Sequence, residues 1–212
     1  MRIILSVLFI CMLLVNNNLL GQTDQNVKKL PSPERDKGMA LMKALDNRHS
    51  SRSFSERDIP DQVLSNLLWA AFGINRDNGK RTAPSSRNIQ DIEIFVAKKD
   101  GLYQYIADKH ALKKKLNKDI RDKTGKQDFV TDAPINLVYV SNHNKVDQGS
   151  PSEFTQGANT GVIVQNVYLY CASEGLSCVV RGYIDKAALR EAMKLEDYKH
   201  ITLSHTIGYP PE

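Results

Sequence analysis

The segment RHSSRSF, residues 48–54, places two arginines and a histidine among three serine hydroxyls. Arg48 and Arg52 are four residues apart, and Ser50 lies between them. Guanidinium groups bind a dianion through paired N–H donors, and a serine hydroxyl adds another donor. On a turn that leaves a helix, these three side chains can converge on one phosphate group. A solvated basic turn is the competing interpretation, because exposed charged side chains need no ligand.

A second polar segment, KRTAPSSRNIQ at residues 80–90, stands directly before a predicted strand. Serine, asparagine and glutamine present donors and acceptors on short side chains, and such a set can bind the polar edge of a heteroaromatic ring. The same composition is typical of ordinary turns. This loop alone therefore does not decide between a binding site and a connection.

Hydrophobic periodicity and capping residues predict the elements that must position these two segments. Helices are expected over residues 37–47, 60–73, 153–175 and 185–194, and strands over residues 92–98, 135–141, 176–180 and 199–209. The lysine-rich residues 107–127 are expected to be helical in pieces. Helices mixed with non-alternating strands predict an α+β fold.

The helix expected over residues 153–175 is the longest of the chain and is apolar nearly all round from Val162 onward. A helix with this pattern is buried on all sides. In a domain of this size, such burial predicts a helix shared with a second subunit.

The N-terminal residues differ in composition from the rest of the chain. Arg2 is followed by an apolar run from Ile3 to Val15 and then by small and polar residues. This run is shorter than the roughly 20 residues that span a bilayer, so residues 1–21 are predicted to be a secretory signal peptide. The protein is then periplasmic or otherwise exported, and no membrane span is expected after cleavage; an uncleaved membrane anchor is the alternative. Residues 22–36 are polar with two prolines and predict a linker.

Composition describes one globular domain with a core of its own, since 41% of the 212 residues are hydrophobic. The formal net charge of +5 is a mild excess that does not by itself imply nucleic acid. The lysines of residues 113–115 lack interleaved aromatic residues and are interpreted as a solvated face, with a lid for an anionic substrate as the alternative. The histidines have no metal-ligand spacing. Cys171 and Cys178 are expected to be separate buried thiols, although they can pair in an oxidising compartment.

Together the two polar segments and the long helix resemble the nitroreductase family of flavin enzymes over about residues 37–210. The family segment R-x-S-x-R/K-x-F is matched by Arg48, Ser50, Arg52 and Phe54. The family loop P-S-S/A-x-N-x-Q is matched by Pro84, Ser85, Ser86, Asn88 and Gln90. The family helix with G-x-x-x-Q-N and a following G-L is matched by Gly161, Gln165, Asn166, Gly175 and Leu176. The turn after the next strand is matched by Val180, Arg181, Gly182 and Tyr183.

This resemblance implies an FMN-dependent, domain-sharing homodimer with a nitroreductase-like fold, in which a mixed or antiparallel sheet is flanked by helices and two flavins lie at the subunit interface. The FMN phosphate would be held by Arg48, Ser50 and Arg52, with His49 also on the flavin. The loop residues Pro84, Ser85, Ser86 and Asn88 would act on the flavin of the other subunit, and Gln90 would support their loop. The backbone N–H groups of Arg181 and Gly182 would lie near the flavin N5.

The resemblance implies transfer of hydride or electrons from a reductant through FMN to an organic acceptor such as a nitroaromatic or a quinone. No catalytic side chain is assigned. NAD(P)H is the usual donor of the family, which conflicts with an exported protein. Alternatives are specialised flavin chemistry, such as reductive dehalogenation or azoline oxidation, and a non-catalytic flavin-binding module. The chain departs from the family in two ways: it ends at GYPPE without a C-terminal Lys/Arg pair, and Arg181 stands where several relatives have glutamate.

Overall fold

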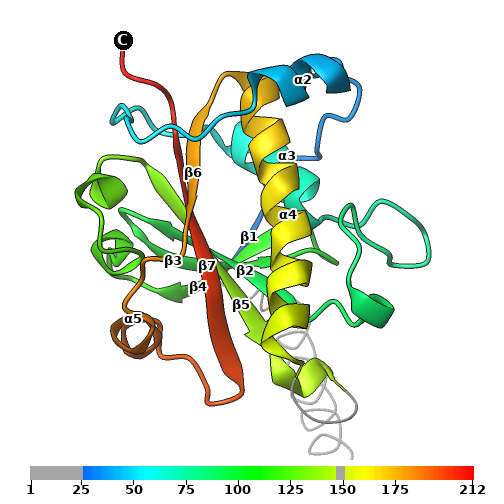
Figure 1. The fold of residues 1–212 in the computed structure, drawn as a ribbon, viewed down its shortest axis with the longest axis vertical. Helices are drawn as coiled ribbons and strands as arrows, with labels where there is room; N and C mark the ends of the chain where they lie inside the picture. Colours follow the sequence, from blue (N-terminus) through cyan, green and yellow to red (C-terminus); the bar gives the residue numbers. More distant parts are fainter. Residues whose placement is uncertain (1–25, 147–150) are drawn as a thin grey trace, which may run out of the picture.

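A seven-stranded antiparallel sheet forms the centre of the chain in the computed structural model, which describes residues 26–146 and 151–212 (Figure 1). Its strand order is β1-β4-β3-β2-β5-β7-β6. The strands are β1 Val27–Lys29, β2 Ile92–Lys98, β3 Gly101–Ile106, β4 Ala111–Leu116, β5 Ile135–Asn142, β6 Ser177–Arg181 and β7 Lys199–Gly208. The helices are α2 Leu41–Asn47, α3 Asp61–Phe72, α4 Glu153–Glu174 and α5 Lys186–Met193. The predicted α+β fold is confirmed.

Helices cover both faces of the sheet, and this explains why apolar residues stand next to one another in β2 and β5 without regular alternation. Ile94 of β2 packs with α3 and α4 on one face, whereas its neighbour Phe95 packs with Leu189 of α5 on the other. Successive side chains of a strand point to opposite faces, so a strand covered on both faces has apolar residues on both. Figure 1 shows α4 crossing one face and α5 on the far side of β7.

The long helix α4 has the bounds expected from the sequence to within one residue, and capping interactions fix both ends. The Ser152 hydroxyl accepts a hydrogen bond from the N–H of Thr155 at 3.1 Å, and Gly175 ends the helix in the left-handed conformation with φ +68°. The predicted burial of this helix on all sides is not reached within one chain. Ile163 faces the core, but the side chain of Phe154 is 84% exposed and that of Val162 is 38% exposed. The chain therefore covers one side of α4 only.

The helical prediction for residues 107–127 is wrong: the segment holds the strand β4 and one short 3-10 turn, Arg121–Lys123, and no α-helix. Strand β4 pairs with β3 on one side and with β1 on the other. Leu112 is buried in the core, and the ammonium of Lys114 lies 5.6 Å from the ring centroid of Tyr103. Backbone pairing and packing of aliphatic lysine stems here override the helix preference of lysine.

The linker prediction for residues 22–36 is also wrong in part. Val27–Lys29 form β1, Leu30 is 3% exposed, and the hydroxyl of Ser65 donates to the carbonyl of Pro31 at 2.6 Å. This segment therefore belongs to the folded domain. The signal peptide predicted for residues 1–21 lies outside the described residues. Among the residues that are described, no helix is long and apolar enough to span a bilayer.

Candidate active site

The segment 48–54 leaves α2 and runs along the outer edge of β6, which is the last strand of the sheet. The N–H of Ser51 donates to the carbonyl of Cys178 at 2.9 Å. The hydroxyl of Ser50 lies 2.8 Å from the hydroxyl of Tyr168, and the guanidinium carbon of Arg48 lies 5.3 Å from the Tyr168 ring centroid. The structure thus brings Arg48 and Ser50 together on one buried tyrosine of α4.

The remaining residues of this segment have different surroundings. Arg52 is exposed, and His49 is exposed with its Nδ1 at 2.7 Å from the carbonyl oxygen of Asn47. Phe54 is buried against Phe129, with ring centroids 5.8 Å apart. Phe54 therefore anchors the end of the segment while the polar side chains before it stay at the surface.

The loop of residues 80–90 is held from within by Gln90. The side-chain amide of Gln90 donates to the carbonyl of Gly79 at 3.1 Å, and its oxygen accepts from Nε of Arg81 at 2.8 Å. The N–H of Gln90 donates to the hydroxyl of Ser85 at 2.9 Å. Arg87, Asn88 and Gln90 all have positive φ, between 49° and 57°. This tight path leaves the side chains of Pro84, Ser86 and Asn88 exposed.

A buried asparagine of α4 joins this loop to the sheet. Oδ1 of Asn159 accepts from the N–H of Ser86 at 2.9 Å, and its amide donates to Asp91 at 2.7 Å. The second Asp91 oxygen accepts from the hydroxyl of Ser141 at 2.8 Å. The sequence analysis did not single out Asn159 or Asp91; the available signal was two polar residues at positions where periodicity predicts burial.

The two predicted binding segments meet α4 at different points along its axis. Ser86 is held by Asn159, and Ser50 is held by Tyr168. At a rise of about 1.5 Å per residue, these two helix positions are about 14 Å apart. Within one chain, the structure does not bring the two segments together.

Arg181 and Gly182 end β6 and differ sharply in exposure. Gly182 is exposed, whereas Arg181 is 4% exposed, with its guanidinium donating to the carbonyl of Thr124 at 2.8 Å and to Oδ1 of Asn136 at 2.9 Å. Burial lowers the pKa of Arg181 from 12.5 to about 10. Its Nε has no hydrogen-bond partner among the described residues. The side chain of Arg181 is therefore enclosed in the interior, and at the end of β6 it is Gly182 that is exposed.

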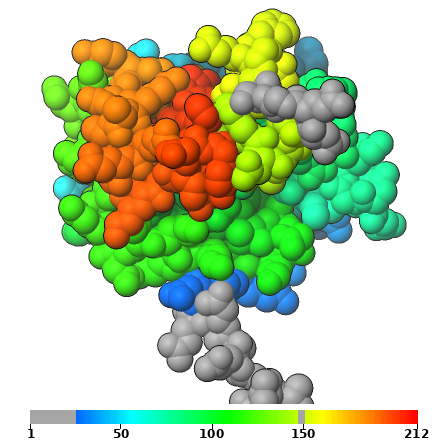
Figure 2. Space-filling model, turned by 90° about the horizontal axis from the view of Figure 1, so that it is seen from below, coloured from blue at the N-terminus to red at the C-terminus, as the bar shows by residue number. Residues whose placement is uncertain are grey.

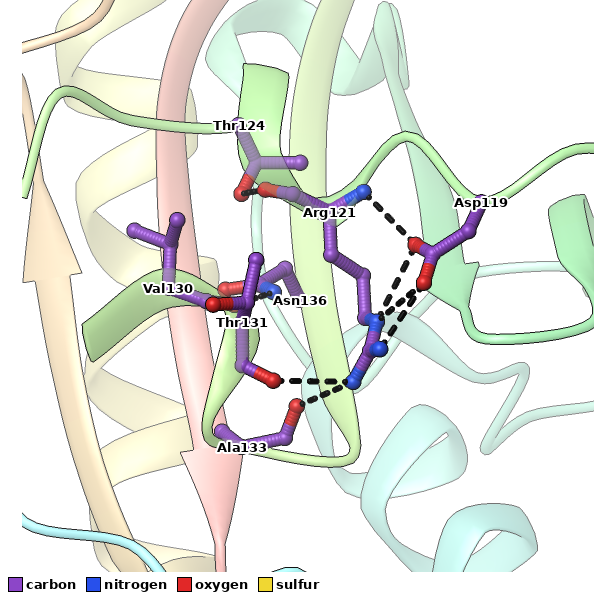
Figure 3. A network of polar contacts seen from close by, with 7 residues as sticks. All are labelled: Asp119, Arg121, Thr124, Val130, Thr131, Ala133 and Asn136. Atoms are coloured by element: carbon purple, nitrogen blue, oxygen red, sulfur yellow. Dashed lines mark hydrogen bonds and ion pairs between the residues drawn. The ribbon is translucent and has the colours of Figure 1, made fainter. Parts of the chain in front are cut away.

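The segment that encloses the Arg181 side chain is itself held by a second arginine (Figure 3). Nη2 of Arg121 lies 2.8 Å from Oδ2 of Asp119, and its Nη1 donates to the carbonyls of Thr131 and Ala133 at 3.2 Å and 3.0 Å. Burial favours a raised pKa of Asp119, but hydrogen bonds from Arg121 keep that pKa below its ordinary value of 3.8. This network fixes the loop carbonyl to which Arg181 donates.

A cavity of about 560 Å³ lies between the start of α4, α5 and β7. Gln156, Gly157, Lys186, Arg190 and Leu203 are among its lining residues. Figure 2 views this face, with α5 and the beginning of β7 in orange beside the yellow-green start of α4. A Cβ placed at Gly182 would lie 3.6 Å from the Leu203 side chain, so the cavity adjoins the turn after β6. Its volume is in the range of small-molecule sites.

The model of the nitroreductase family matches residues 45–209, a range that contains both polar segments, α4 and the turn after β6. This chain belongs to the nitroreductase family. The family resemblance inferred from the sequence is thereby confirmed, and the antiparallel sheet with α4 across one face is the nitroreductase-like fold.

Individual nitroreductase-family proteins show how far the similarity extends. A crystal structure of a provisionally assigned nitroreductase from Ralstonia eutropha JMP134 is 42% identical, with a TM-score of 0.84 over 91% of this chain and 93% of that chain. A provisionally named nitroreductase of Methanocaldococcus jannaschii is 29% identical over 74% of this chain and 86% of that protein. A provisionally assigned nitroreductase from Desulfovibrio desulfuricans, crystallised with FMN, shares the fold at 19% identity, with a TM-score of 0.62 over 83% of this chain and 89% of that chain.

Proposed function

We propose that this protein is an FMN-dependent oxidoreductase that acts as a homodimer and passes hydride or electrons from a reductant to an organic acceptor, such as a nitroaromatic or a quinone. The observation that carries the proposal is the open cationic site at residues 48–52. Within the described residues, neither Arg48 nor Arg52 forms an ion pair; Arg48 and the Ser50 hydroxyl meet at Tyr168, and Arg52 is exposed two residues farther along the segment. Two uncompensated guanidinium groups and a hydroxyl are a donor set suited to a phosphate dianion.

The turn after β6 suits the ring end of the same cofactor. Gly182 is exposed, its backbone carries no side chain that would obstruct a planar ring, and the cavity beside it is large enough for a small organic molecule. We propose that the backbone at Arg181 and Gly182 borders a ring placed there; Gly182 is exposed, and the Arg181 side chain remains in the interior. When bound, FMN supplies a ring that accepts and returns two electrons. The protein positions that ring and limits the access of water and acceptor.

A homodimer explains why the loop of residues 80–90 and the cationic segment lie apart in one chain. We propose that Pro84, Ser85, Ser86 and Asn88 contact the flavin of the partner subunit. In support, α2 exposes Leu41, Met42 and Leu45, and α4 exposes Phe154 and Val162. Large exposed apolar side chains on two helices are compatible with a protein–protein interface.

We propose that the protein is located outside the cytoplasm, because residues 1–21 have the composition of a signal peptide. We therefore also propose an electron donor other than cytoplasmic NAD(P)H, such as a membrane-bound reductant. If the isolated protein turns over with NADH or NADPH and begins at Met1, this part of the proposal is wrong. N-terminal sequencing of the protein from its native host distinguishes a cleaved signal peptide from a retained anchor.

The cofactor content of the isolated protein tests the central proposal. We expect a yellow protein with one FMN per chain that bleaches under dithionite and regains its colour in air, with faster recovery when a quinone or nitroaromatic is added. A colourless protein that takes up no added FMN would overturn the proposal. Stable FMN that no donor reduces would instead support the non-catalytic flavin-binding module.

A further inference from the structure

Tyr168 joins three parts of the chain at the cationic segment. Its hydroxyl lies 2.8 Å from the hydroxyl of Ser50 and accepts a hydrogen bond from the N–H of Val180 at 3.0 Å. Its ring faces Arg48 at 5.3 Å and packs against His205 with centroids 4.8 Å apart. The residue is 6% exposed, so these contacts are held in a rigid setting.

The hydroxyl of Tyr168 completes the outer edge of β6. Along an edge strand, outward carbonyl and N–H groups need partners. The outward carbonyl of Cys178 accepts from the N–H of Ser51, and the outward N–H of Val180 donates to the Tyr168 hydroxyl. The segment 48–52 and Tyr168 thus share one strand edge, which sets the position of Ser50 relative to Arg48.

The order of the hydroxyl protons follows from the acceptors present. A phosphate dianion only accepts hydrogen bonds, so a Ser50 hydroxyl that binds it must donate to it. The Ser50 oxygen must then accept from Tyr168, whose own oxygen already accepts from Val180. The chain of donors runs from Val180 N–H to Tyr168 O–H to Ser50 O–H and outward to the anion.

We propose that Tyr168 is the positioning residue of the phosphate end of the flavin site: its hydroxyl directs the Ser50 proton outward, and its ring seats Arg48. This inference rests on the proposed function. Such positioning favours phosphate binding, because two preset donor groups lose less conformational freedom on binding than mobile ones.

The test compares the dissociation constants of FMN and riboflavin, which lacks the phosphate, for the apoprotein dimer. Tyr168→Phe keeps the ring and removes the hydroxyl. We expect it to weaken FMN about five- to tenfold, in line with one lost hydrogen bond, while riboflavin affinity changes less than about twofold. Ser50→Ala should give the same pattern, and the double variant should be no worse than Ser50→Ala, because the two groups act as one unit.

Tyr139→Phe is the matched control, since Tyr139 is a buried tyrosine whose hydroxyl lies 3.2 Å from Nδ1 of His205. It should leave the ratio of FMN to riboflavin affinity unchanged. Equal loss for both flavins in Tyr168→Phe, or no loss for either, would overturn the inference. If Tyr168→Phe does not fold, Ser50→Ala and Ser50→Thr decide: the inference requires that alanine lowers the ratio and threonine restores it. Wild-type protein that binds neither flavin contradicts the proposed function itself.

Discussion

The guanidinium of Arg181 occupies the space in which any side chain at residue 125 would lie. A Cβ placed on Gly125 would come within 1.6 Å of Nη1 of Arg181. Gly125 has ordinary backbone angles, so glycine is required here for space and not for conformation. The pair couples a buried cation at the end of β6 to the loop that Arg121 holds in place.

Gly125→Ala should destabilise the fold by about 1–3 kcal/mol, because the added methyl group displaces a buried, hydrogen-bonded guanidinium. Urea unfolding of the apoprotein measures this. Gly157→Ala in α4 is the control with the opposite sign: nothing lies within 4 Å of its Cβ, so the helix should gain up to about 1 kcal/mol. An unchanged Gly125→Ala protein would show that Arg181 leaves its buried position at low cost.

Asn159→Ala should loosen the loop of residues 80–90 and cost about 1–3 kcal/mol of stability. The substitution leaves the N–H of Ser86 without its acceptor and takes one donor from the buried carboxylate of Asp91. Trypsin should cut after the exposed Arg87 faster than in the wild type. Asn166→Ala is the control on the same helix as Asn159. It removes one hydrogen bond to the carbonyl of Ala70 in α3 and should not change cleavage at Arg87.

The free energy of unfolding should decrease as the pH is lowered below about 6.5, because of His205. Burial lowers the pKa of His205 from 6.5 to about 3, with the charge of Arg181 as a second cause, so the folded protein holds a neutral imidazole. Between these pH values the unfolded chain binds a proton that the folded chain does not, so stability rises with pH. The cost from about pH 7 to about pH 5 is about 2 kcal/mol.

His205→Gln should remove this part of the pH dependence, measured as urea unfolding free energies at the two pH values. His49→Gln, at an exposed histidine outside the sheet, is the control. The same pH dependence in His205→Gln and wild type would mean that the imidazole is protonated in the folded protein.

Arg52→Ala should weaken FMN binding about tenfold or more without lowering the melting temperature, because Arg52 is exposed and forms no ion pair within the described residues. Fluorescence titration with FMN measures the effect. Arg57→Ala is the control, since the Arg57 guanidinium carbon lies 4.0 Å from the Tyr209 ring centroid and is not assigned to the phosphate. Unchanged FMN affinity in Arg52→Ala would count against the phosphate assignment.

A protein that begins at residue 31 should be less stable than one that begins at residue 26. The shorter protein loses β1 and the buried Leu30, and it exposes the edge of β4. We expect a lower melting temperature and concentration-dependent aggregation, measured by light scattering, because an uncovered strand edge pairs with other chains. Equal behaviour of the two proteins would restore the linker interpretation of residues 22–36.

The local pattern of the sequence was sufficient for α4, β2 and β5. Ser152 and Gly175 mark the ends of α4 by their own capping chemistry, and the apolar runs of β2 and β5 are long enough to identify as strands. The segment 48–52 carries two guanidinium groups and hydroxyls within five consecutive residues, which is compatible both with a dianion site and with a solvated basic turn, so the dianion site stays a prediction. These features depend on residues close together in the chain.

Only the tertiary structure decided the features that depend on distant partners. The lysines of β4 adopt strand conformation because β1 and β3 pair with this segment on either side. The Arg181 side chain enters the interior because Gly125 leaves room for it. The contact between Tyr168 and Ser50 exists because the fold brings the two residues together across a separation of 118 residues. Sequence spacing specifies which groups a segment carries, whereas long-range packing specifies which of those groups meet.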